Sequence, residues 1–417
     1  MRVLISGAGI AGPALAWHLA KTGASITIVE KSHALLPHGQ NIDVNGSALT
    51  VIEKMGLMDQ LRAYHTNEKG AQLIDPKGRP FAPFPVREGS SASPTSEFEI
   101  LRGDLSKVVY EATRDCPNVE YVFGTTITKV VSNGQESVKV ELSNGEVREY
   151  GLLVAADGQW SRLRKQCFPA DAVTVIDKRM YAVYWTIPRL PGDNDMWNIY
   201  HALGSRILSI RPDPHGTMRA CFTHMPCNDR QEREWKEAAK SDRQTQKALV
   251  RKEFGDAGWQ AERLLEAMQT APDFYFQAVQ QIKLAKWSIG RVICLGDAAY
   301  APSPLTGAGA SLALIGGYVL GGELSKLKDG EHPCSAFDAY ERVFRPFVEQ
   351  VQDLPSFVPG IAHPESAAKR WILQTFIAVL SRIVAIPWLV KWIDHDSNEQ
   401  DFPLPRYPIF EGEKQLK

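Results

Sequence analysis

The first thirty residues carry the pattern that most constrains the fold of this chain. An apolar run at 1–6 is followed by the turn GAGIAG at 7–12, a helical pattern at 13–22, and a second apolar run at 26–29 that ends at Glu30. Strand, glycine-rich turn, helix and strand in this order predict a βαβ unit of the doubly wound α/β type. Glycine-rich turns also occur for conformational reasons alone, so the order of the elements carries the prediction.

The three glycines of this turn suit the binding of a dinucleotide. Gly7 permits a tight turn, Gly9 lets the backbone approach a pyrophosphate, and Gly12 allows the helix to pack closely. The helix start adds amide groups and the positive end of the helix dipole, and the acid after the second strand is expected to accept hydrogen bonds from a ribose. The predicted contacts of this unit are Gly7, Gly9, Ile10, Ala11, Gly12, Glu30 and Lys31.

A second glycine-bearing segment lies far along the chain. An apolar strand at 292–295 delivers Gly296 and Asp297 to a loop, and two further glycines within 307–309 precede a helical run at 310–324. A loop of this kind can hold a polar ligand.

With this segment the sequence resembles the FAD-dependent monooxygenases of the para-hydroxybenzoate hydroxylase type, whose GDAAHxxxPxxGxG motif lies against the flavin. The stretch LRGDL at 101–105 is similar to the family's arginine-containing helix start, and DGQWSRLR at 157–164 matches its DGxxSxxR pattern. The segment SPLTGAGASLAL at 303–314 is similar to the tetracycline-inactivating branch and to tailoring monooxygenases of secondary metabolism. The sequence departs from the family pattern at Tyr300, Ala308 and Ser311.

The resemblance implies an FAD whose flavin is held by the second segment. The cofactor contacts that it implies there are Gly296, Asp297, Pro304, Gly307, Ala308, Gly309 and Ala310. Backbone amides at 307–309 would face the pyrimidine end of the isoalloxazine, and the helix after them would favour the anionic reduced flavin. Asp297 is expected to accept a ribityl hydroxyl and Arg102 to contact the ribityl or pyrophosphate part, with a turn cap and a surface ion pair as their alternatives. Asp157 and Arg164 resemble the family pair linked to the cofactor and to NAD(P)H use, and a structural role is the alternative for Arg164.

A polar stretch after the Glu30 strand lies where the family chain passes near the flavin ring. It consists of Gln40, Asn41, Ile42 and Asp43. These residues are expected to orient the ring or the substrate, and an ordinary turn is the alternative.

The resemblance implies a single-component monooxygenation. NADPH or NADH reduces FAD, O2 forms a flavin C4a-hydroperoxide, and one oxygen atom enters an aromatic, polyketide-like or other unsaturated small molecule. Because the flavin carries this chemistry, no catalytic side chain is assigned. The substrate wall is expected on strands of the middle region, although strand aromatics are usually core residues. The candidate substrate contacts are Tyr184, Trp185, His201, Arg211, Phe222 and His224.

Other flavoprotein classes fit the sequence less well. The redox cysteine pair of disulfide reductases and the second GxGxxG of two-Rossmann Baeyer-Villiger enzymes are missing from the sequence. Three alternatives remain open: a reductase of the geranylgeranyl-reductase type, a nonenzymatic FAD-binding protein, and a flavin-dependent halogenase. The halogenase is considered because VYWTIP at 183–188 is similar to a WxWxIP stretch.

The 417 residues exceed what one core usually supports, so we expect an α/β fold with two domains and C-terminal helices. Residues 1–175 and 285–350 are expected to form a discontinuous Rossmann-like FAD-binding domain. Residues 176–284 would form an inserted β-sheet domain that binds the substrate, and 351–417 a C-terminal helical segment.

Bulk properties restrict the partners and the cellular compartment that we expect for this chain. A formal net charge of -1 argues against nucleic acid as a partner, and six cysteines without a CxxC pair or a metal-like cluster indicate reduced thiols in the cytoplasm. We expect no metal and a monomer or weak homodimer. The apolar stretch 371–392 contains Arg382 and Pro387, so helices packed on the enzyme body are favoured over a peripheral membrane or oligomer contact and over a membrane span.

Overall fold

A six-stranded sheet forms the first half of the protein, in a computed structural model that describes residues 1–36, 39–86, 98–355, 357–384 and 401–411. The strand order is β17-β18-β11-β1-β2-β7, with β17 and β18 antiparallel and the other neighbours parallel. The strands are β1 (Arg2–Ser6), β2 (Ser25–Glu30), β7 (Val119–Phe123), β11 (Leu152–Ala155), β17 (Ser288–Ile289) and β18 (Val292–Cys294). Because the order reverses at β1, the crevice beyond the carboxyl ends of β1 and β11 is the expected ligand site of such a sheet.

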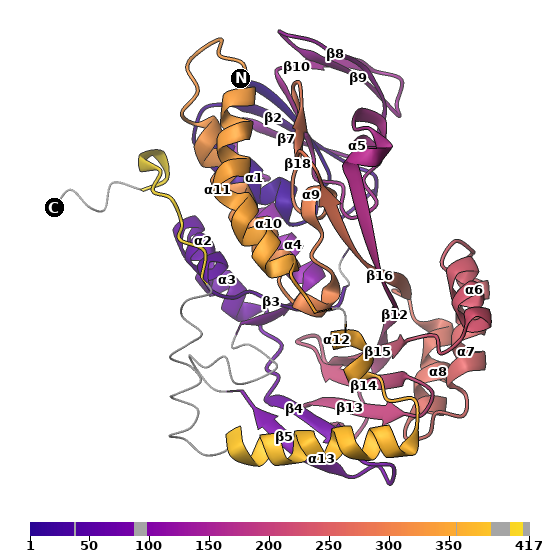
Figure 1. The fold of residues 1–417 in the computed structure, drawn as a ribbon. Coiled ribbons are helices and arrows are strands. Elements are labelled where there is room, and N and C mark those ends of the chain that lie inside the picture. The colour runs from indigo at the N-terminus through magenta and orange to yellow at the C-terminus, as the bar shows by residue number, and fades with distance from the viewer. Residues whose placement is uncertain (37–38, 87–97, 356, 385–400, 412–417) are drawn as a thin grey trace, which may run out of the picture.

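Long helices pack on this sheet, as Figure 1 shows in its upper half. The main ones are α1 (Ala11–Ala20), α4 (Arg102–Glu111), α10 (Gly309–Leu324) and α11 (Cys334–Gln352). Glycines let α10 approach α1 closely: a Cβ on Gly317 would lie 3.0 Å from the Leu15 nitrogen, and one on Gly321 would lie 2.7 Å from the His18 Cβ. The helix after the second glycine segment is therefore fixed directly against the helix after the first.

A seven-stranded sheet forms the second half, in the order β16-β12-β15-β14-β13-β4-β5. Its strands are β4 (Gly70–Ile74), β5 (Pro80–Pro85), β12 (Val173–Pro188), β13 (Trp197–Ala202), β14 (Arg206–Pro212), β15 (Thr217–His224) and β16 (Tyr275–Leu284). The expectation that 1–175 belongs wholly to the first domain is wrong for 70–85, because β4 pairs with β13 in this second sheet.

Strand alternation gives the second sheet two different faces. One face packs under α6 (Asp229–Ala238), α7 (Arg243–Phe254) and α8 (Ala261–Thr270), in a core that includes Trp185, Phe222 and Trp235. On the other face Met180, Ala182 and Val279 form a small cluster, and Leu305 from the second glycine segment packs against it. This second face is therefore turned toward the predicted flavin site, and we call it the cofactor-side face.

Smaller elements complete the fold. They are β3 (Asn41–Asp43), β6 (Glu99–Leu101), β8 (Ile127–Asn133), β9 (Val138–Leu142), β10 (Val147–Tyr150), α2 (Ser47–Met55), α3 (Met58–Ala63), α5 (Arg162–Cys167), α9 (Asp297–Tyr300), α12 (Val358–Ala362) and α13 (Ala367–Val384). Helix α13 packs along β5 at the bottom of Figure 1.

The chain near its C-terminus returns to the first half as an extended strap at 401–411. The Ser47 hydroxyl donates to the Phe402 carbonyl at 2.6 Å, and the Tyr318 hydroxyl donates to the Pro405 carbonyl at 2.7 Å. The proposed helical segment 351–417 therefore includes a mostly extended part, with one short 3-10 helix η4 (Pro408–Phe410), that is bound to α2 and α10.

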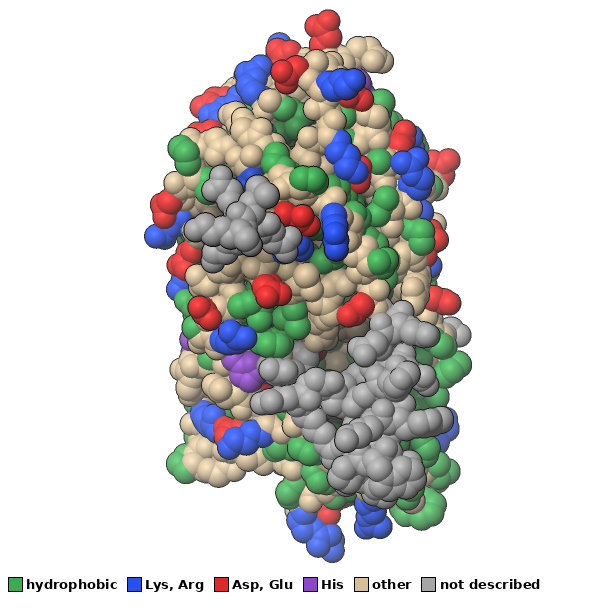
Figure 2. All heavy atoms as spheres, turned by 90° about the vertical axis from the view of Figure 1, so that its left-hand side faces the viewer, with side chains coloured by type: hydrophobic (Ala, Val, Ile, Leu, Met, Phe, Trp, Pro, Cys, Tyr) green, Lys and Arg blue, Asp and Glu red, His purple; other side chains and the backbone are tan. Residues whose placement is uncertain are grey.

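The surface mixes charges of both signs, as the face in Figure 2 shows. In the part of the chain that the structure describes, no helix has the length and hydropathy required to cross a bilayer. Of the apolar stretch 371–392, the first part lies in α13, whose outer side exposes Trp371 and Phe376. Residues 385–392 lie outside the described residues.

Candidate functional site: a nucleotide crevice facing a second sheet

The first glycine turn has a steric reason for each of its outer glycines. Gly7 has a φ of 112°, and a Cβ there would overlap the Ala156 carbonyl oxygen. A Cβ on Gly12 would overlap the Gly7 carbonyl oxygen. At Gly9 a Cβ would meet nothing within 4 Å, so its surface is open to a ligand. The tight turn and the close packing are confirmed, and the pyrophosphate contact of the open face stays a prediction.

Glu30 closes this turn from the end of β2. Its carboxylate accepts hydrogen bonds from the Ala8 amide and from the Ser32 amide, both at 3.0 Å. These bonds fix the carboxylate in place at the edge of the crevice, with lone pairs remaining for a ribose. Lys31 is exposed next to it.

The second glycine segment meets the first one in space. Gly296 has a φ of 63° and a Cβ there would lie 3.0 Å from the Ala11 Cβ, at the start of α1. Further on, Ser303 has a φ of 83°, a strained value for a residue with a side chain, and its hydroxyl accepts from the Leu305 amide at 3.1 Å. Strain of this kind is typical of loops that are shaped for a ligand.

Asp297 lies where three elements converge. A Cβ on Gly309 would be 3.8 Å from the Asp297 Oδ1, which places the carboxyl beside the start of α10. Burial raises the pKa of Asp297 above its ordinary value, and the nearby Arg102 guanidinium lowers it in part. The same Arg102 lowers the pKa of the Tyr275 phenol, which burial raises. One acid, one cation and one phenol thus act on each other at this position.

The predicted polar stretch 40–43 lies against the second segment. The Gln40 carbonyl accepts from the Arg102 amide at 3.0 Å, and the Asn45 amide donates to the Ser311 hydroxyl at 3.3 Å. A Cβ on Gly307 would be 3.8 Å from the Asp43 Oδ2. Residues 41–43 are strand β3, which pairs with β6, so the stretch is not an ordinary turn.

The pair Asp157 and Arg164 divides into two roles. Asp157 uses Oδ2 to accept from the Arg162 amide at 2.8 Å, whereas its buried Oδ1 has no partner among the described residues. Arg164 is buried and donates to the carbonyls of Ala298 at 2.7 Å and Gln159 at 2.8 Å. The expected cofactor contact of Arg164 is therefore corrected: its guanidinium joins two loops of the site, and burial lowers its pKa.

These residues fit an FAD. The backbone at Gly9 is open, the Asp157 Oδ1 lacks a partner in the described region, and Asp297 faces the start of a sixteen-residue helix. Residues of both glycine segments would hold it, with the adenosine end at Glu30 and the flavin end at 307–309.

Three of the six candidate substrate contacts lie on the wrong side of the second sheet. Trp185, Phe222 and His224 are buried on the face that α6–α8 cover, and the Trp185 indole donates to the Leu264 carbonyl at 3.2 Å. These three predictions are wrong, because the side chains belong to the core. Tyr184 lies next to the contact between Leu305 and the sheet. It stays a candidate.

His201 and Arg211 lie on the cofactor-side face but are enclosed by other groups. His201 is buried near His363 and Arg370, and burial lowers its pKa to about 4. Arg211 donates two hydrogen bonds to Glu68, at 2.8 and 2.9 Å, and also pairs with Glu99. Its guanidinium is therefore shared by two buried carboxylates before any substrate arrives.

Glu68 and Glu99 were missed by sequence reasoning. Glu99 also accepts from the Asn41 side chain at 2.5 Å and from the Thr66 hydroxyl at 2.9 Å, and the side chains of both acids are 1% exposed. Burial raises the pKa of Glu68, and Arg211 opposes that rise. The available signal was Glu99 itself, an acid between the apolar residues Phe98 and Ile100 at the start of a short strand.

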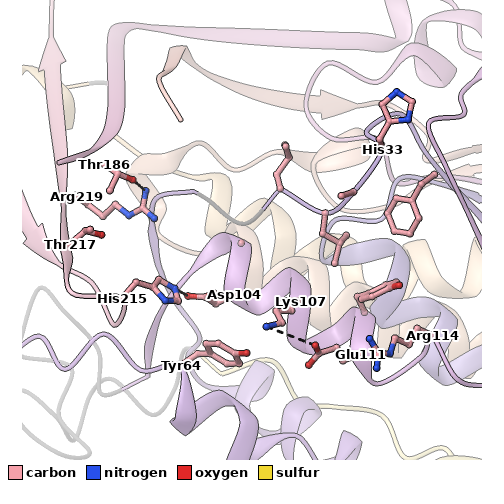
Figure 3. A pocket seen from close by; sticks show the side chains of 16 residues that line it. His33, Tyr64, Asp104, Lys107, Glu111, Arg114, Thr186, His215, Thr217 and Arg219 are labelled. Atoms are coloured by element: carbon pink, nitrogen blue, oxygen red, sulfur yellow. Dashed lines mark hydrogen bonds and ion pairs between the residues drawn. The ribbon is translucent and has the colours of Figure 1, made fainter. Parts of the chain in front are cut away.

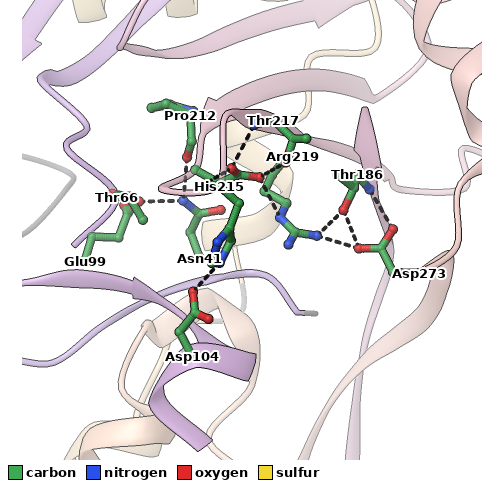
Figure 4. A network of polar contacts seen from close by, with 11 residues as sticks. Asn41, Thr66, Glu99, Asp104, Thr186, Pro212, His215, Thr217, Arg219 and Asp273 are labelled. Carbon is green, nitrogen blue, oxygen red and sulfur yellow. Dashed lines mark hydrogen bonds and ion pairs between the residues drawn. The ribbon is translucent and has the colours of Figure 1, made fainter. Parts of the chain in front are cut away.

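A polar network joins the two halves beside this cluster, as Figure 4 shows. Asp104 of α4 contacts His215 of the second sheet at 2.9 Å, and Asn41 donates to the Pro212 carbonyl at 3.3 Å. Arg219 pairs with Asp273 and with the Thr186 hydroxyl. The site is thus built between two halves that are fixed to each other by charged and amide groups.

Fold and site together define a nucleotide-binding flavoprotein, and comparisons with known proteins give the same class. Residues 1–354 match the family described as FAD binding domain, and the chain belongs to that family. It is an FAD-dependent monooxygenase.

The relatives carry this assignment over nearly the whole chain. Monooxygenase CTB7 of Cercospora beticola is 36% identical, with 91% of this chain and 92% of the relative covered. Flavin-dependent monooxygenase eupH of Phoma sp is 35% identical, covering 88% of each.

Two solved structures are similar in fold. The tetracycline destructase Tet(55) aligns with a TM-score of 0.76 and 29% identity, covering 97% of this chain and 98% of that one. Klebsiella pneumoniae HpxO complexed with FAD and uric acid aligns with a TM-score of 0.72 at 20% identity, over 97% and 98%, and shows the fold alone.

Proposed function

We propose that this enzyme uses NADPH or NADH and O2 to insert one oxygen atom into an aromatic, polyketide-like small molecule. The observation that carries the proposal is that Leu305, from the second glycine segment, packs against the cluster of Met180, Ala182 and Val279 on the second sheet. A substrate next to the flavin end would thus lie between this loop and the cofactor-side face.

Bound FAD would supply the redox chemistry, accepting two electrons and passing them to O2. The residues of the chain would position the cofactor and stabilise the charge that develops on it. Amides at 307–309 and the start of α10 would favour negative charge at the flavin end. Asp297 and Arg102 would hold the polar chain of the cofactor. Arg164 fixes the segment that carries Asp297, through the Ala298 carbonyl, to the loop that carries Gln159.

An apolar, aromatic substrate suits the described wall. Tyr184, Met225 and Leu305 cluster on the cofactor-side face, and Tyr275 pairs with Tyr184 on the neighbouring strand. The similarity to a tetracycline destructase supports a polycyclic substrate. Arg211 is already paired, so a strongly anionic substrate would have to displace Glu68 or Glu99.

The halogenase alternative loses its sequence support. The tryptophan of 183–188 is Trp185, which is buried under α8 and bonded to Leu264. Its place in this chain is explained by packing. The two relatives named above are monooxygenases by name, and neither name refers to a halogenase or to an alkene reductase.

A substrate panel tests the proposal. Purified enzyme should consume NADPH or NADH faster when an aromatic polyketide is added, with one O2 used per product and a product mass increased by one oxygen. Saturation of an alkene without O2 uptake would contradict the proposal and favour a reductase.

We also propose that the protein is a monomer or a weak homodimer. Size-exclusion chromatography with light scattering measures its mass in solution and tests this proposal.

A further inference from the structure

Helix α13 carries an apolar side that is turned to solvent. The helix packs along β5, the edge strand of the second sheet, at the lower end of the molecule (Figure 1). Its large exposed apolar side chains have exposed fractions between 38% and 68%. They are Trp371, Ile372, Phe376, Val379, Leu380 and Ile383. We call this side the outer face of α13.

The outer face is continuous along the helix. Ile372, Phe376, Val379 and Ile383 follow one another at helical spacing, so they form one line on an α-helix of about 3.6 residues per turn. A helix on the surface of a globular protein normally turns its apolar stripe toward the core and its polar residues toward water. The outer face of α13 therefore suits an apolar environment outside the protein.

The inner side of α13 contains polar groups that bind the protein. Ser381 is buried there, and the Arg370 guanidinium donates to the His201 carbonyl at 3.3 Å. Packing on the enzyme body and contact with a second, apolar phase are thus compatible, because they use opposite sides of one helix.

The charges of α13 all have the same sign. The helix contains Lys369, Arg370 and Arg382 and no acid. Helical periodicity places Lys369 and Arg382 at opposite edges of the outer face, where both are exposed. Lys369 pairs at 2.6 Å with Glu365, but such an exposed pair contributes little to stability and an anionic group can replace the carboxylate. Cations at the edges of an apolar stripe match anionic headgroups above acyl chains.

The length and packing of α13 favour a helix that lies on a membrane. Eighteen residues span about 27 Å, which is shorter than a hydrocarbon core of about 30 Å. The contacts with β5 also hold one side of the helix against the protein. Only the outer face can therefore enter a lipid layer.

A second copy of the chain fits the outer face less well than a lipid surface. Two outer faces in contact would bring the cations of both helices together, with no acid on either helix to compensate. We propose that the outer face of α13 binds an anionic lipid surface. Trp371 and Phe376 enter the boundary between headgroups and acyl chains, and Lys369 and Arg382 contact the headgroups. The inference is independent of the substrate of the enzyme.

Ligands in the interior do not cover the outer face. Figure 3 shows a cavity of about 780 Å³ between α4, the loop 33–36 and strands of the second sheet. None of the described residues of α13 lines this cavity. Variants of the outer face should therefore retain FAD and activity in the absence of lipid.

Vesicle sedimentation with the FAD-loaded enzyme tests the proposal. Vesicles of phosphatidylcholine with about 30% phosphatidylserine should bind the enzyme at least about tenfold more tightly than vesicles of phosphatidylcholine alone. This binding should weaken as the NaCl concentration rises, because salt screens the headgroup charge. An enzyme that stays in the supernatant with the anionic vesicles at low salt would overturn the inference.

An apolar double variant tests the inserted side chains. Trp371→Ser combined with Phe376→Ser removes rings that are 68% and 66% exposed, so the melting temperature and the bound flavin should not change. The binding constant for the anionic vesicles should fall at least about tenfold. The matched control is Val131→Ser with Val147→Ser, two exposed residues of β8 and β10 at the opposite end of Figure 1. Equal loss of binding in the control would overturn the inference.

A second double variant tests the charges. Lys369→Gln combined with Arg382→Gln should weaken binding to the anionic vesicles about tenfold and leave binding to phosphatidylcholine unchanged. Its control is Lys129→Gln with Lys139→Gln, exposed cations of β8 and β9. Unchanged binding to anionic vesicles in both the apolar and the charged variant would show that another surface binds lipid, and would overturn the inference.

Light scattering without lipid tests a second copy as the occupant of the outer face. We expect the same mass for the wild type and for the variant with Trp371→Ser and Phe376→Ser. A wild-type dimer that becomes a monomer in this variant would assign the outer face to contact between copies and would overturn the inference.

Discussion

The Asp297 carboxyl lies where several parts of the predicted flavin site meet. Asp297 is the first residue of α9, which follows β18. Its carboxyl lies next to Gly309 at the start of α10, and the Arg102 guanidinium is near enough to lower its pKa. The raised pKa reflects a position where protein has replaced water around the acid. A hydroxyl-rich ligand would restore the hydrogen bonds that water provides elsewhere.

Replacing Asp297 should therefore release the cofactor. Asp297→Ala is expected to raise the dissociation constant of FAD at least tenfold, because one charge-assisted hydrogen bond contributes about 1.5–3 kcal/mol. Absorbance at 450 nm after gel filtration measures the bound flavin. Asp338→Ala, on the exposed side of α11, is the control. Full flavin occupancy of Asp297→Ala would contradict this placement of the loop.

Substitutions at two glycines of the first turn should affect different properties, the stability of the fold in one case and the affinity for FAD in the other. Gly12→Ala places a Cβ against the Gly7 carbonyl oxygen and should lower the free energy of unfolding by about 1–3 kcal/mol. Gly9→Ala meets nothing within 4 Å, so it should keep stability but weaken FAD. Urea unfolding and flavin titration measure the two effects. Equal loss of stability in both variants would contradict the steric account.

At the residue scale, local motifs could be predicted and long-range pairings could not. The roles of Gly7 and Gly12 follow from a turn whose parts are close in sequence. Arg211 is paired with Glu68 and Glu99, which lie more than a hundred positions earlier, so its saturated state is a property of the fold. Local spacing contains no sign of that pairing.

At the scale of the element, the alternation of side chains along a strand decides which residues can face a substrate and which belong to the core. In β12, odd-numbered residues such as Val183 and Trp185 enter the core under α6–α8, and even-numbered residues such as Ala182 and Tyr184 face the cofactor side. The alternation was visible in the sequence. Which face the helices cover depends on packing against α6–α8, which come much later in the chain, so the sequence does not show which aromatic residues face the cofactor side.

Neighbouring positions of β12 should respond in opposite ways to a conservative change. Trp185→Phe removes the bond to the Leu264 carbonyl and should lower stability by about 1–3 kcal/mol, with an unchanged KM for the substrate. Tyr184→Phe should change the KM and leave the melting temperature nearly unchanged. Thermal melts and steady-state kinetics measure this contrast. A KM effect at Trp185 without a loss of stability would contradict the assignment of faces.

At the scale of the whole molecule, four histidines that are buried in the described part of the chain lower its stability in acid. Burial lowers the pKa of His18 and His224 to about 3, and of His201 and His363 to about 4. In the unfolded chain these groups bind a proton near pH 6.5. Below that pH the unfolded state binds more protons, so the free energy of unfolding falls as pH falls toward 4.

The slope of the free energy of unfolding against pH can be measured by urea unfolding at saturating FAD between pH 7.5 and 5. Each neutral histidine is expected to cost about 1 kcal/mol per pH unit below pH 6, with smaller values where water enters. His18→Leu should flatten the slope, and replacement of the exposed His33 by Gln should not. A stability that is constant or rises toward pH 5 would contradict the buried neutral state.

The architecture could be predicted in outline: an α/β unit, an inserted sheet and C-terminal helices. The first unit follows from a local pattern of strand, turn and helix. The return of 70–85 to the second sheet and the binding of the strap 401–411 to α2 and α10 depend on distant partners. Their own sequences are short and irregular, so local propensity could not place them.

The central claim is that the two glycine-bearing segments bind opposite ends of one FAD molecule. A crystal structure of the protein grown with FAD tests it most directly. The account predicts one FAD per chain, with the pyrophosphate at Gly9 and the start of α1, and the isoalloxazine against 307–309. Flavin bound elsewhere, or a colourless protein that takes up no FAD from a saturating solution, would contradict it.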